Sequence, residues 1–126
     1  MQQTIKNFET ATALPKGRIV AYSATEKQVA LAVSPASSIA GVTDQSSTLA
    51  GRVDVQQAGQ VLVEFGGDVL PGEPLMADDE GRAVVFDAAV ALPDAGDVAW
   101  IVGVAEEEGV EGSQGYIRLS PQMLIK

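Results

Sequence analysis

Acidic side chains gather at two places in the sequence, and their types and spacing are the first to suggest chemistry. Asp78, Asp79 and Glu80 stand directly before Gly81, and residues 106–108 form a second acidic run. Neighbouring carboxylates can bind calcium, but an EF-hand loop needs oxygen ligands at alternate positions and a glutamate well downstream. Neither run has that spacing, and charge runs usually mark solvated faces. We therefore interpret residues 78–81 as a solvated hairpin turn and expect no metal ion.

The side chains that most often carry catalysis are missing or isolated. The chain has no cysteine and no histidine, which excludes thiol nucleophiles, the usual zinc sites and histidine bases. No phosphate-binding Gly-x-x-x-x-Gly-Lys-Ser/Thr or Gly-x-Gly-x-x-Gly motif occurs, and aromatic platforms for a sugar are few. We therefore predict that the protein is not an enzyme and uses no cofactor. The lysines, which a Ser–Lys pair would need, stand in polar contexts near chain ends or turns: Lys6, Lys16, Lys27 and Lys126.

A Gly-Arg pair followed by apolar residues occurs three times, at residues 17–18, 51–52 and 81–82. One interpretation is an anion site. The other is a strand that begins after a turn glycine and turns its arginine toward solvent. The second is favoured, because glycine readily adopts the positive φ angles of turns.

The charge balance limits the partners of the chain. Its 126 residues carry 17 acids and 8 bases, a formal net charge of −9. Nucleic acids and anionic membranes attract clustered Lys and Arg, so direct binding to either is not expected. No apolar run reaches the roughly 18 residues of a membrane-spanning helix, and the N-terminus lacks the apolar stretch of a signal peptide. We expect a soluble protein that is made in the cytosol.

Alternation of apolar and polar residues is the main signal of secondary structure. It predicts half-buried antiparallel strands. Residues 19–22 and 98–104 are more continuously apolar, as in strands that are buried on both faces. The alternating segments are residues 28–33, 52–56, 60–65 and 116–120.

Turn signals divide these segments. Ala58-Gly59 suggests a tight hairpin, and Pro71-Gly72 is a strong turn signal. Helix is limited to a short turn around residues 44–49 and another near residues 87–92. Eight or nine strands at this spacing predict an all-β fold, a single compact β-sandwich or β-barrel-like domain.

One phrase occurs twice, as "SIAGVTDQ" at residues 38–45 and "WIVGVAEE" at residues 100–107. Each is interpreted as a strand whose glycine permits a bulge or a close approach of another backbone. A polar loop and an alternating strand follow both copies, which predicts two similar hairpin-like units.

Residues 1–13 differ from the domain expected over residues 14–126. They are polar, and after Met1 their only large apolar side chains are Ile5 and Phe8. Chain ends of this kind are usually loose unless a partner orders them. The sequence therefore predicts a flexible N-terminal arm.

The order of these motifs resembles that of the bacteriophage capsid cement proteins, also called head decoration proteins. Those small β-rich proteins share a Gly-Asp/Glu-Pro-Leu segment, an Asp-x-x-Gly-Arg-Ala turn and a late Gly-Val/Ile-Ala strand. The resemblance covers about residues 14–121, and the short arm before it also fits. The matching segments are Gly72-Glu73-Pro74-Leu75, Asp78-Asp79-Glu80-Gly81-Arg82-Ala83 and Val102-Gly103-Val104-Ala105.

The resemblance implies a domain of β-tulip type and a structural role in the virion. Such proteins bind the outer surface of the expanded capsid, commonly as homotrimers at threefold positions. They stabilise the lattice of the major capsid protein against DNA pressure. The implied partners are the major capsid protein and further copies of this chain, and the implied place of synthesis is the bacterial cytoplasm.

The arm is the candidate capsid contact, either as a strand added to a capsid sheet or as an irregular extended segment. A disordered tail without a role is the alternative for the arm, and a small β-barrel that binds a ligand or peptide is the alternative function. Trp100, Phe86 and Leu92 are candidates for a trimer contact only through their size, and core burial is favoured for each. The candidate capsid-binding residues are Gln2, Gln3, Thr4, Ile5, Lys6, Asn7 and Phe8.

Overall fold

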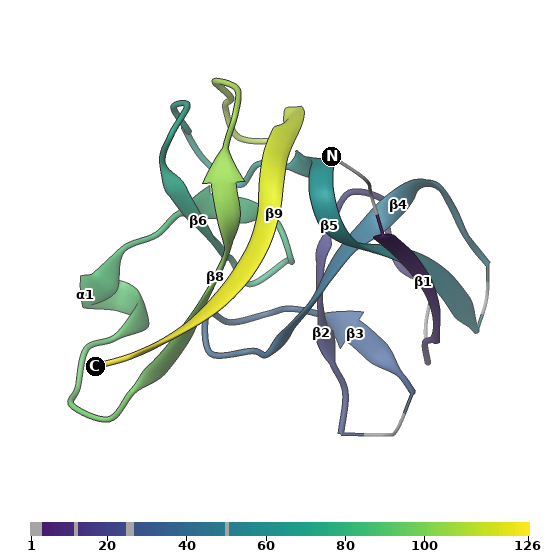
Figure 1. Cartoon of the computed structure of the whole chain (residues 1–126), viewed down its shortest axis with the longest axis horizontal. Helices are drawn as coiled ribbons and strands as arrows, with labels where there is room; N and C mark the ends of the chain where they lie inside the picture. The colour runs from purple at the N-terminus through teal and green to yellow at the C-terminus, as the bar shows by residue number, and fades with distance from the viewer. Residues whose placement is uncertain (1–3, 12, 25–26, 50) are drawn as a thin grey trace.

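The alternating segments of the sequence form strands of one curled antiparallel sheet (Figure 1). The computed structural model describes residues 4–11, 13–24, 27–49 and 51–126, and nine strands and one short helix lie within them. No helix of this described part is long and apolar enough to span a membrane. The all-β prediction is confirmed in its barrel-like form, since the sheet curls into half a barrel. The elements are β1 (Thr4–Glu9), β2 (Ile19–Tyr22), β3 (Val29–Leu31), β4 (Ile39–Leu49), β5 (Arg52–Glu64), β6 (Pro74–Ala77), β7 (Ala83–Val85), α1 (Ala88–Ala91), β8 (Val98–Ala105) and β9 (Gln114–Ile125).

The order of the strands shows that the two halves of the chain fold in the same way. The order in the sheet is β3-β2-β4-β5-β9-β8-β6-β7, with β1 beside β5. In the first half, β2 to β5, the order from the edge inward is β3-β2-β4-β5. In the second half, β6 to β9, the order from the opposite edge inward is β7-β6-β8-β9, which is the same pattern. The two halves meet where β5 pairs with β9, and all pairings between these strands are antiparallel.

The glycines of the repeated phrase occupy equivalent places in these halves. Gly41 lies in β4 and Gly103 in β8, and each strand has a register shift beside its glycine. A Cβ atom at Gly41 would overlap the carbonyl oxygen of Gln56, and one at Gly103 would overlap that of Arg118. Only glycine allows the next strand to approach this closely. The predicted close approach is confirmed at both copies.

The hairpin expected at Ala58-Gly59 is wrong, because the chain continues there as the single strand β5. Before this point β5 pairs with β4 and β1, and from Gly59 onward it pairs with β9. Gly59 has a φ of 91°, which glycine adopts without steric cost. The glycine marks a change of partner within one strand instead of a turn between two.

One of the two expected helical turns is confirmed. The helix α1 lies within residues 87–92, and the Asp87 carboxylate accepts the Ala89 N–H at its start (3.0 Å). The turn expected at residues 44–49 is wrong, because these residues belong to β4. Pairing with β5 across the hairpin at Gly51 overrides their weak local pattern.

Buried side chains form two clusters on opposite faces of β2. Ile19 and Ala21 contribute to the larger cluster, which joins residues of both halves, and Val20 contributes to the smaller one. The expectation that residues 19–22 are buried on both faces is confirmed for these three residues. The smaller cluster consists of Phe8, Leu14, Val20, Val29, Ala40, Val53 and Val55, with Leu31 packed against it.

The predicted arm is a strand of the sheet over Thr4–Glu9. This segment, β1, pairs with β5 in register from Ile5 to Glu9. Phe8 is 6% exposed and Ile5 is 51% exposed, because residues three apart in a strand face opposite sides. The structure therefore differs from an arm that stands apart from the domain. Phe8 is buried in the smaller cluster with Val53, and removal of its apolar surface from water stabilises β1 on the sheet.

Candidate functional site

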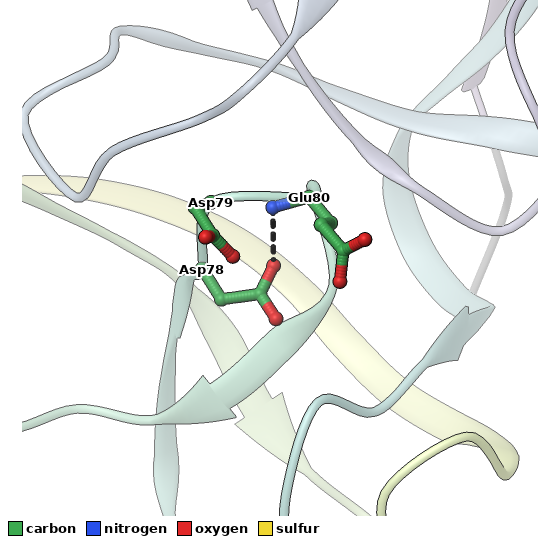
Figure 2. A group of neighbouring side chains, drawn as sticks. All are labelled: Asp78, Asp79 and Glu80. Atoms are coloured by element: carbon green, nitrogen blue, oxygen red, sulfur yellow. Dashed lines mark hydrogen bonds between the residues drawn. The ribbon is translucent and has the colours of Figure 1, made fainter.

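The acidic run at residues 78–80 forms the turn between β6 and β7. The carboxylate oxygens of its three side chains lie within 4.8 Å of one another. Asp78 Oδ1 accepts the backbone N–H groups of Glu80 and Arg82, each at 2.8 Å. Figure 2 shows the Asp78 carboxylate inside the arc of the turn, where it accepts the N–H of Glu80. The Asp78 side chain therefore closes the turn, as the turn interpretation predicts.

Arg82 supplies a cation to this acidic turn. Its Nε donates to Asp78 Oδ2 at 3.0 Å, and its guanidinium lies 2.9 Å from Glu80 and 3.7 Å from Glu111. Burial lowers the pKa of Arg82, but the hydrogen bond to Asp78 and the charges of the three acids raise it more, so the net shift is upward. Two of the three carboxylates that could bind a metal ion, those of Asp78 and Glu80, thus pair with a permanent cation of the chain.

The second acidic run also makes contacts within the fold. Glu106 accepts a hydrogen bond from the Gln60 side chain (3.0 Å) and lies 3.6 Å from the Arg118 guanidinium. Glu107 accepts the backbone N–H of Tyr116 (2.6 Å). These carboxylates connect β8 to β9 and β5, which is a structural use of acidic side chains.

The three Gly-Arg pairs begin strands or turns, and their glycines have positive φ angles of 69°, 88° and 74° at Gly17, Gly51 and Gly81. Two of the arginines differ from the expectation, because Arg18 and Arg82 keep only 18% and 17% of their side chains exposed. Arg18 lies 3.2 Å from Glu64, and Arg82 pairs with acids as described above. Arg52 alone of the three faces solvent, at 58% exposure.

The residues predicted to bind a capsid lie along β1 where they are described. Gln2 and Gln3 fall outside the described residues, as does the side chain of Thr4. Ile5, Lys6 and Asn7 are exposed, and Phe8 is buried. Three of the seven predicted residues are thus exposed at the surface.

A hollow of about 540 Å³ lies beside β1 and brings together residues that are far apart in the sequence. We call it the β1 hollow. Lys6 Nζ lies 5.4 Å from the centroid of the Phe8 ring, and the Phe8 ring meets the Tyr22 ring edge to face at 6.1 Å. The residues lining the hollow are Lys6, Asn7, Phe8, Glu9, Tyr22, Lys27 and Arg52.

The sequence did not predict that four of the hollow's residues come together: Glu9, Tyr22, Lys27 and Arg52. Lys27 reaches β1 because its carbonyl accepts the Glu9 N–H (3.0 Å), and its own φ is 66°, a rare value for lysine. Arg52 reaches β1 through the antiparallel register, in which it lies opposite Glu9. The positive φ of Lys27 and the pairing of β1 with β5 have no signature in the local sequence.

The described residues thus form a half-barrel antiparallel sheet of two similar four-stranded units, with an added N-terminal strand. A scan of protein-family models finds no match, and no curated protein matches the sequence.

A solved structure does share the fold. The N base of the head fiber protein gp8.5 of bacteriophage phi29 matches with a TM-score of 0.64. The match covers 94% of this chain and 95% of that chain, at 20% sequence identity. The likeness therefore extends over nearly the whole of both chains and shows a common fold.

Proposed function

We propose that the protein is a structural component of a phage virion, bound to the outer surface of the expanded capsid. There it stabilises the lattice of the major capsid protein against the pressure of the packaged DNA. The observation that carries this proposal is the shared fold over 94% of the chain with the base of a phage head fiber. The order of the sequence motifs supports the same assignment independently of the fold.

The proposal includes no catalysis and no cofactor. Its support lies in the way the two acidic runs are used. Asp78 closes a turn beside Arg82, and Glu106 and Glu107 bond to neighbouring strands. These acidic side chains stabilise turns and contacts between strands. Such a structural role agrees with a protein whose function is to stabilise a capsid.

Attachment is proposed to use β1 and several copies of the chain at once. Along one edge β1 pairs with β5, and along its other edge the described residues show one isolated bridge, Glu9 to Gln28. A sheet edge of this kind can accept a strand from a partner. In a homotrimer three such edges would bind one shell together, which raises the effective concentration of each contact.

Mass measurement and co-sedimentation test this function. Light scattering after size exclusion is expected to give the mass of a trimer. The protein is expected to sediment with expanded shells of the major capsid protein encoded in the same genome. The alternative, a β-barrel binding module, would be supported if the protein is a monomer, does not bind the shells and melts at a higher temperature with a small ligand.

A further inference from the structure

The charge of the β1 hollow is opposite to that of the molecule as a whole. The chain carries 17 acids and 8 bases, yet among the described residues that line this hollow three are bases, Lys6, Lys27 and Arg52, and one is an acid, Glu9. Cations that surround a concave surface focus a positive potential in it. The hollow is therefore a place where an acidic protein attracts a negatively charged group.

The three cations are available to an incoming anion. Neither Lys6 nor Lys27 forms a salt bridge with any carboxylate of the described residues, and both are exposed. Arg52 lies 3.7 Å from Glu9 in a pair whose side chains are 58% and 48% exposed. Arg52 also donates through Nε to Asn7 Oδ1. Exposed ion pairs contribute little, so the terminal nitrogens of Arg52 can exchange Glu9 for another carboxylate.

The hollow also offers an apolar surface and a backbone edge. The Tyr22 ring is half exposed and packs edge to face on Phe8, so an apolar side chain can rest against it. The edge of β1 that faces away from β5, where the described residues form one isolated bridge from Glu9 to Gln28, can bond to an extended backbone over its remaining residues. The volume, about 540 Å³, lies in the range of ligand pockets in proteins.

From these features we infer that the β1 hollow binds an extended protein segment that carries carboxylate side chains. Lys6, Lys27 and Arg52 contact the carboxylates, and Tyr22 contacts a neighbouring apolar side chain. A long polyanion such as a nucleic acid fits less well, because the net charge of −9 repels it beyond the hollow. This inference rests on the proposed function, in which the acidic segment belongs to the phage shell.

A charge-reversal pair tests the inference on shells. The double variant Lys6→Glu/Lys27→Glu is compared with Lys16→Glu, a control that reverses an exposed lysine outside the hollow. At low salt the double variant is expected to bind shells about tenfold more weakly or worse, and the control within about threefold of wild type. If reversal disturbs folding, as seen by circular dichroism, Lys6→Gln/Lys27→Gln replaces it with the same expected direction.

The shell result separates the inference from the proposed function. If wild type and both variants bind equally, the inference is wrong and the proposed function stands. If wild type does not bind shells at all, the proposed function fails, and a peptide titration decides the inference.

In that titration an extended peptide with alternating valine and glutamate is added to wild-type protein and followed by NMR. Saturating shifts at Lys6, Lys27 and Tyr22, absent with the glutamine analogue, are expected. Unchanged spectra, or a stronger response to inorganic phosphate or to single-stranded DNA, would overturn the inference.

Discussion

Two glycines show how a single residue can determine the packing of this sheet. At Gly103 a Cβ atom would overlap the carbonyl oxygen of Arg118 in the adjacent strand. Backbone atoms cannot move aside as the end of a flexible side chain can. Any side chain at this position must therefore separate β8 from β9, and Gly41 has the same relation to β5.

We predict that Gly103→Ala lowers the free energy of unfolding by about 3 kcal/mol or more, the upper end for overpacked sites. Urea denaturation measures the change. Gly67→Ala is the matched control, because a Cβ at Gly67 meets no atom within 4 Å, and a change below about 1 kcal/mol is expected. Equal stability of the two variants would contradict the close approach of the strands.

The Asp78 carboxylate closes the acidic turn between β6 and β7. Asp78→Ala removes the acceptor of two backbone N–H groups and of Arg82 Nε, so a loss of about 2 kcal/mol is expected. Millimolar calcium should leave the melting temperature of the wild-type protein unchanged. A calcium-dependent rise that Asp78→Ala abolishes would show that the cluster binds the metal, against our interpretation.

Residue patterns predicted these local features well. The glycine of each repeated phrase, the turn at Asp78 and the alternation of Val61, Val63 and Phe65 all have strong local signatures. The ion pairs of Arg18 and Arg82 were not predicted. The partner of Arg18, Glu64, lies in the distant strand β5, and Arg82 meets Asp78 only because the turn folds back on itself.

Among the elements, β1 changes most between sequence and structure. Its two large apolar residues stand three apart, and the strand buries Phe8 in the smaller cluster while Ile5 remains exposed. Removal of the whole segment would expose the valines of β5 as well as remove a binding surface. Point variants on the two faces of β1 separate stability from binding, which a deletion cannot do.

We therefore predict different effects from the two faces of β1. Phe8→Ala should lower the free energy of unfolding by about 3 kcal/mol, as expected for truncation of a buried aromatic residue. Ile5→Ala should change it by less than about 0.5 kcal/mol. Denaturant titration of both variants gives the comparison, and a Phe8→Ala protein as stable as wild type would indicate that β1 does not cover the cluster in solution.

The length of β5 could not be predicted, for a reason that also applies to β4. A strand that changes partner at Gly59 looks locally like two strands with a turn, and the polar end of β4 looks like a loop or helical turn. In both cases pairing between distant segments decides the structure. Such pairing leaves little trace in a single sequence.

At the scale of the whole molecule, the two similar halves form one sheet, and β1 is added to the first half alone. The two halves therefore differ at β1, and the β1 hollow lies there. The remaining surface carries the excess of acids. In the described part of the chain, charge is therefore distributed unevenly, with three bases at the β1 hollow and an excess of acids elsewhere.

Cryo-EM of expanded shells mixed with the purified protein tests attachment to the outside of a phage shell. We expect added density at the threefold positions of the outer surface, into which three copies of the half-barrel fit with β1 toward the shell. Bare shells at saturating concentrations of folded protein would contradict it.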